Sequence, residues 1–113
     1  MDSLAFKALF GETAVAHGFV AAKRIWYRPA RAALVVLALQ KSNFGNHFDM
    51  NLKLYLDRSV PKNATELKAI SGYSNGDIFR RQPKESNAAF DLDSAMELPT
   101  RRAVIDYVFR TLI

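Results

Sequence analysis

The chain has 113 residues, 50% of them hydrophobic and 24% charged, which predicts one globular domain over residues 1–113 with a single core. The formal net charge is +5, and the basic excess lies within residues 1–41, which indicates either a polyanionic or acidic partner or only a solvated face. The absence of cysteine excludes disulfides, cysteine-ligated zinc and thiol catalysis and favours the cytoplasm, while the longest apolar run, residues 32–39, is too short to span a membrane.

The first predicted element is a helix that begins near the N-terminus, where no signal peptide is expected. Asp2 or Ser3 can cap it, because a short side-chain oxygen there accepts a hydrogen bond from an orphan backbone N–H. Gly18 is expected to end it. One face of this helix carries Phe6, Leu9, Phe10, Thr13 and His17.

Three strands are predicted next. Residues 19–28 form the first, which Pro29 and Ala30 end. Residues 32–41 are apolar on both faces, which predicts a central strand that needs cover on both sides. Residues 47–57, "HFDMNLKLYLD", alternate strictly, so Leu52 should be buried under the helices and Lys53 should lie on a wet face. The turn at residues 42–46 joins the last two strands into a hairpin.

The remaining chain predicts a short helix, a further strand and a final helix. The short helix covers residues 61–70, with Asn63 or Thr65 as its cap, and a loop follows at residues 71–76. Residues 77–82 predict a fourth strand, residues 83–89 a loop and residues 90–92 a short extended piece. Thr100 can cap the last helix, whose apolar stripe is Val104, Ile105, Val108, Phe109 and Leu112.

These elements predict an α+β fold in which an N-terminal helix, an antiparallel meander of three to four strands, a short helix and a C-terminal helix follow one another. The first and last helices are expected to cover one sheet face. The other face is left to a second subunit, which would make the protein a homodimer, or to the short helix, which would leave it a monomer. We favour the dimer at this point.

Several segments resemble an uncharacterised bacterial family, domain of unknown function 4304. They are "HGF", "IWYRP", "LALQKSNFGNHFDMNL" and "DIFRR", and the matching residues are Gly18–Phe19, Tyr27–Arg28, Gln40–Lys41–Ser42, Phe48, Asn51–Leu52 and Asp77. The resemblance covers about the first three-quarters of the chain. It implies an α+β fold and a bacterial origin, and it brings no known activity with it.

Two groups of residues are candidate sites. The first gathers at one end of the central hairpin and consists of Gln40, Lys41, Ser42, Asn43, Asn46 and His47. It predicts either a polar pocket, with Lys41 and His47 available for anion binding or acid–base chemistry, or only a turn rich in Asn, Ser and Gly. Loops on a rigid hairpin often carry sites, so an enzyme would have its site here. An enzyme is nevertheless the weakest of the three functional alternatives, because the chain has no catalytic motif.

The second group lies on the first strand and the turn after it, and consists of Lys23, Arg24, Trp26, Tyr27, Arg28 and Arg31. Basic residues beside aromatic platforms are what single-stranded nucleic acid requires, and the competing explanation is an edge strand protected by charge. Arg24 and Arg28 are both expected to be exposed.

Neither a cofactor motif nor a metal-ligand pattern is found, so no cofactor and no metal are expected. Asp91, Asp93 and Glu97 lack the spacing of a calcium loop and read as a solvated acidic loop. The leading prediction is a non-enzymatic cytoplasmic module that binds a protein, with a second copy of itself as one such partner. Nucleic-acid binding through the basic hairpin is the alternative, and no membrane partner is expected.

Overall fold

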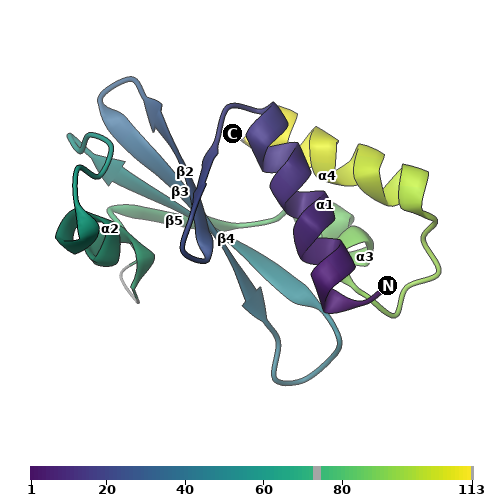
Figure 1. Ribbon diagram of the computed structural model, residues 1–113. Helices are drawn as coiled ribbons and strands as arrows, with labels where there is room; N and C mark the ends of the chain where they lie inside the picture. Colours follow the sequence, from purple (N-terminus) through teal and green to yellow (C-terminus); the bar gives the residue numbers. More distant parts are fainter. Residues whose placement is uncertain (73–74, 113) are drawn as a thin grey trace.

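The computed structural model describes residues 1–72 and 75–112. A five-stranded antiparallel sheet forms the middle of the fold, and its strands follow one another across the sheet in chain order (Figure 1). They are β1 (Val20–Ala22), β2 (Ile25–Ala30), β3 (Ala33–Lys41), β4 (Phe48–Leu56) and β5 (Ile78–Arg81). The register of β3 and β4 runs from Ala33 opposite Leu56 to Lys41 opposite Phe48, which confirms the predicted hairpin.

One face of the sheet is covered by α1 (Ser3–Ala16) and α4 (Leu98–Leu112), which lie side by side, as predicted (Figure 1). The short helix α3 (Asn87–Phe90) packs against α4. Aromatic rings join the layers, since Phe6 stacks on Phe48 with ring centroids 5.2 Å apart. The larger side chains of this core are Phe6, Leu9, Phe10, Phe19, Val35, Leu37, Phe48, Met50, Leu52, Phe90, Leu92, Ile105, Val108 and Phe109.

The opposite face is covered by α2 (Ala64–Ser71), which lies on the other side of the sheet from α1 and α4 (Figure 1). Ile70 of this helix is 1% exposed. It packs into a second, smaller cluster with Ile25, Leu34, Val36 and Tyr55. The sequence left either a second subunit or the short helix to cover this face, and in the structure the short helix covers it. The bare sheet face that favoured a dimer is therefore not there, and the oligomeric state stays a prediction.

The two neighbours Leu52 and Lys53 test the predicted faces of β4. Leu52 is 4% exposed under the helices, as expected. Lys53 is 5% exposed, so the expectation of a wet face at this position is wrong. The reason is α2 and the residue that follows it, because Lys53 Nζ donates a hydrogen bond to the Gly72 carbonyl at 2.9 Å. Burial also lowers the pKa of Lys53 below its ordinary value of 10.5.

The predicted single strand over residues 19–28 is in fact two strands joined by a tight turn. Lys23 and Arg24 adopt positive φ angles of 25° and 68°, which reverse the chain between β1 and β2. Such turns usually carry Asn or Gly, and this one carries neither, so turn composition does not predict it. Pro29 does not end β2 but pairs with Leu34. Because β1 stops earlier, β2 is an edge strand at Pro29, where its missing N–H costs nothing.

The predicted N-terminal caps agree with the structure in two of three helices. The Asp2 side chain accepts a hydrogen bond from Ala5 N–H and caps α1, and the Asn63 side chain caps α2. The predicted Thr100 cap is wrong, since α4 already begins at Leu98. Pro99 lies in its first turn, where the absent N–H is one that would have no helical partner.

Three other segments complete the comparison. The predicted loop at residues 83–89 contains the 3-10 helix η1 (Lys84–Ser86) and most of α3. The extended piece at residues 90–92 is reduced to an isolated bridge between Asp91 and His47. The predicted loop at residues 71–76 includes residues 73 and 74, which lie outside the described residues. In the part of the chain that the structure describes, no helix has the length and apolar character to cross a membrane.

Candidate functional site

Within the predicted polar group, Lys41 and Ser42 make hydrogen bonds inside the β3–β4 turn. Ser42 N–H donates to the His47 carbonyl at 2.9 Å, and the Ser42 hydroxyl accepts a hydrogen bond from Phe44 N–H at 3.0 Å. Lys41 Nζ is 3.5 Å from the Gly45 carbonyl. Asn43 is exposed on the turn. These contacts are those of a hairpin turn.

Asn46 and His47 connect this turn to the acidic loop. Asn46 Nδ2 donates to Asp93 Oδ1 at 2.8 Å, and the Asn46 carbonyl accepts a hydrogen bond from Leu92 N–H at 2.9 Å. His47 forms the isolated bridge with Asp91. The acidic loop around Asp91 and Asp93, predicted to be only solvated, is thus hydrogen-bonded to the end of the hairpin.

A hollow of about 250 Å³ lies beside His47. Its other lining residues are Phe48, Asp49, Gln82, Asn87, Ala88 and Asp91. The pocket predicted from the sequence would be lined by Lys41, Asn43 and His47. Of these three residues, only His47 lines the hollow. The hollow therefore combines His47 with polar residues other than the predicted ones, and anion binding or acid–base chemistry by Lys41 and His47 stays a prediction.

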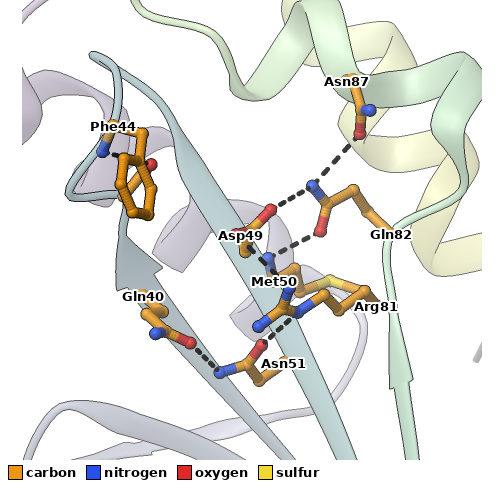
Figure 2. A network of polar contacts seen from close by, with 9 residues as sticks. Gln40, Phe44, Asp49, Met50, Asn51, Arg81, Gln82 and Asn87 are labelled. Atoms are coloured by element: carbon orange, nitrogen blue, oxygen red, sulfur yellow. Dashed lines mark hydrogen bonds and ion pairs between the residues drawn. The ribbon is translucent and has the colours of Figure 1, made fainter.

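The amide groups in this hollow bind one another (Figure 2). Gln82, which follows β5, accepts a hydrogen bond from Met50 N–H at 2.8 Å through Oε1. Its Nε2 donates to Asp49 Oδ1 and to Asn87 Oδ1, each at 3.2 Å. Gln82 thereby continues the sheet edge beyond β5 and joins it to α3, which is a structural task.

A second branch of the network crosses the sheet (Figure 2). Asn51 Nδ2 donates to Gln40 Oε1 at 3.0 Å, and Asn51 Oδ1 accepts a hydrogen bond from Arg81 Nε at 3.3 Å. Arg81 also lies 3.8 Å from the Asp49 carboxylate. Gln40 is therefore held in a strand-to-strand ladder. Over residues 1–72 and 75–112, no three His, Asp or Glu side chains lie close enough together to hold one metal ion.

The predicted basic and aromatic group is divided by the sheet. Trp26 and Tyr27 are neighbours on a strand, so their side chains point to opposite faces. Trp26 packs on the α1 side, with its ring centroid 5.0 Å from that of Phe10, and Tyr27 joins the cluster under α2. Lys23 and Arg24 lie at one end of β2 and Arg31 at the other. The six residues do not form one continuous surface.

Arg28 is not exposed as expected. It is half-buried, and its Nη1 donates to the His17 carbonyl at 2.7 Å. Its guanidinium lies 4.7 Å from the centre of the Phe19 ring. His17, which the sequence placed on the apolar face of the first helix, contacts Asp106 through Nε2 at 2.8 Å. That contact and the nearby Arg110 lower the pKa of Asp106 below its ordinary value of 3.8.

An apolar groove of about 590 Å³, which no sequence motif indicated, runs along α4 beside η1. Tyr107, on its border, is 59% exposed. Pro83, Ala103, Val104 and Val108 are its other apolar lining residues, and Glu85, Ser86, Thr100, Arg110 and Thr111 are the polar ones. Helical periodicity assigns Val104 and Val108 to the core stripe of α4, so it does not predict that both residues also line a groove.

Two further side chains that the sequence did not single out are Arg101, which is buried, and Lys7, which stands on the exposed side of α1. Neither belongs to a motif, and each acquires its surroundings only when distant segments meet. No family model matches the chain, and no curated protein or solved structure matches it either, so the resemblance to the uncharacterised bacterial family stays a prediction.

Proposed function

We propose that this protein is a non-enzymatic interaction module that binds a second copy of itself through the groove along α4. The observation that supports the proposal is the combination of an apolar groove with a largely exposed aromatic side chain, Tyr107. Large apolar patches on a monomer commonly mark protein contacts, and tyrosine is among the residues that contribute most to them.

The charges at the groove are compatible with a second copy as the occupant. In a chain with a net charge of +5, the groove is lined by one acid, Glu85, and one base, Arg110, which also pairs with Asp106 at 2.9 Å. In a twofold contact the same surface meets itself, so the acid of each subunit can lie opposite the base of the other. The proposal keeps the cytoplasmic location, for which the lack of cysteine is the only support. Bacterial origin rests on the resemblance alone.

Sedimentation equilibrium between 1 and 200 µM tests the proposal. We expect the average mass to rise from 12.7 kDa towards twice that value as the concentration increases. Tyr107→Glu should hold the protein at the monomer mass, because a buried carboxylate without a partner opposes the contact. Phe44→Ser is the matched control, since Phe44 is an aromatic residue that is 99% exposed on the β3–β4 turn.

The Phe44→Ser variant should associate like the parent protein. A parent protein that stays at 12.7 kDa over the whole range would overturn the proposal. Equal loss of association in both variants would show that the contact is not at α4.

A further inference from the structure

A second hollow, of about 510 Å³, lies between α1 and the sheet and is lined by Lys7, Arg24, Trp26 and Leu39. These residues come from α1, the β1–β2 turn, β2 and β3. Trp26 and Leu39 belong to the sheet face that α1 covers, because Trp26 pairs with Leu37, two residues before Leu39 on the same face. The hollow thus has an aromatic and aliphatic floor and a basic border.

The basic border is unneutralised. Among the described residues, no carboxylate forms an ion pair with Lys7 or Arg24, and none lines the hollow. A third cation stands close to the same place, because Lys7 Nζ and Lys41 Nζ lie 5.7 and 6.0 Å from the centre of one ring, that of Phe48. Lys7 and Arg24 border the hollow from two segments, and two cations on one concave surface attract an anion.

The floor is held in place by α1. A Cβ at Gly11 would lie 3.5 Å from Trp26 Nε1, an ordinary contact distance, so one edge of the indole packs against this turn of the helix. Phe10 meets the indole at 64°, with ring centroids 5.0 Å apart. The rest of Trp26 stays half-exposed beside Leu39, which is also half-buried. A fixed aromatic surface of this kind suits stacking by a planar ring.

From these observations we infer that the hollow binds one nucleotide unit, with the base against Trp26 and Leu39 and the phosphate between Lys7 and Arg24. Its volume lies in the range of small-molecule sites, roughly 300–1,000 Å³. One base fits better than a tract of bases, because Tyr27, the only aromatic neighbour of Trp26 along β2, faces the other side of the sheet. A free nucleotide and a base from a single strand share this chemistry. The inference does not depend on self-association.

The chain contains one tryptophan, so its intrinsic fluorescence reports directly on this hollow. We would titrate the protein at 50 mM salt with adenosine 5′-monophosphate, adenosine, inorganic phosphate and an eight-nucleotide single-stranded oligodeoxyadenylate. Saturable quenching by the monophosphate is expected, at least tenfold weaker binding by adenosine, and no quenching by phosphate. Tighter binding of the oligonucleotide would identify a single strand as the source of the base, and tighter binding of the monophosphate a free nucleotide.

A matched pair of double variants separates specific binding from general charge attraction. Lys7→Gln with Arg24→Gln should weaken binding at least tenfold, and both residues are exposed, so the fold should be retained. Lys62→Gln with Lys68→Gln removes the same charge at exposed positions around α2, on the other sheet face, and should bind like the parent. Equal losses in the two variants, adenosine binding as tightly as its monophosphate, or no saturable quenching at 5 mM of any probe would overturn the inference.

Discussion

Arg101 is the largest of the fully buried side chains, with 2% of its surface exposed, and we expect it to hold the acidic loop in place. Its Nη1 donates to the Ala89 carbonyl at 2.7 Å and to the Asp91 carbonyl at 2.9 Å. Its Nη2 lies 3.2 Å from the Ser94 hydroxyl and 3.4 Å from the Met96 carbonyl. One guanidinium thus serves several acceptors along residues 89–96, and no carboxylate among the described residues pairs with it.

Arg101→Met keeps an apolar stem of similar length but leaves the Ala89 and Asp91 carbonyls without their donor. A buried acceptor that loses its partner costs about 1–3 kcal/mol, and because the Asp91 bond is only part-buried, the two together predict a loss of at most about 6 kcal/mol. Removal of the buried charge returns part of its desolvation cost. The expected decrease in the free energy of unfolding is therefore about 3 kcal/mol.

Urea unfolding followed by circular dichroism measures this decrease, and Arg102→Met is the control at the adjacent position. Arg102 is exposed and pairs with Glu12 at 3.3 Å across the surface, so its loss should cost less than about 0.5 kcal/mol. Hydrogen exchange at Leu92 N–H, which donates to the Asn46 carbonyl, should accelerate only in Arg101→Met. Equal losses of stability in the two variants would refute the role of the buried guanidinium.

Three further changes have expected outcomes. In the unfolded chain Lys53 keeps its proton up to pH 10.5, whereas burial lowers its pKa in the folded protein. The free energy of unfolding measured in urea should therefore rise with pH just below 10.5, and Lys53→Met should abolish this rise. The hydrogen bond from His17 is the largest cause of the lowered pKa of Asp106. The stability that this carboxylate adds is lost as the pH falls below 3.8, and Asp106→Asn should flatten the acid limb of the curve of stability against pH. Gly76→Ala should cost about 1–3 kcal/mol in urea unfolding, because φ is 69° and the new Cβ would lie 2.7 Å from the Leu54 oxygen.

Controls of the same chemical type exist for each change. Gly72 has a φ of −83°, and a Cβ there would meet nothing closer than 3.5 Å, so Gly72→Ala should leave stability unchanged or raise it. Lys62→Met and Glu97→Gln alter exposed residues and are the controls for Lys53→Met and Asp106→Asn. A control whose stability changes as much as that of its partner variant would contradict the corresponding prediction.

The parts of the fold that the sequence could predict are those in which one face of an element is buried. The alternation from Phe48 to Leu56 predicts β4 and the burial of Leu52, because apolar residues at every second position of a strand share one face, here the face under α1 and α4. The apolar stripe through Ile105 and Phe109 predicts α4 in the same way, because apolar residues three or four positions apart share one face of a helix. Local chemistry likewise sufficed for the Asn63 cap.

The parts that it could not predict depend on where distant segments meet. Lys53 is polar in a strictly alternating strand, and only the return of α2 over that face buries it. The β1–β2 turn is formed by Lys23 and Arg24, residues with no turn preference, so its position follows from the pairing of the strands on either side. Arg101 acquires its acceptors from the loop before its own helix.

The candidate sites show both effects at once. Trp26 and Tyr27 are adjacent in sequence, and the period of a strand is enough to place them on opposite faces, so a shared stacking surface could have been excluded from the sequence. Lys7 lies 19 positions before Trp26 and shares no motif with it, yet both border one hollow. Adjacency on a strand separates side chains, and folding of α1 onto the sheet brings others together. Binding chemistry in this chain therefore depends on which side chains share a sheet face. Trp26 and Tyr27 are neighbours in sequence but lie on opposite faces, whereas Lys7 and Trp26 are distant in sequence but line one hollow.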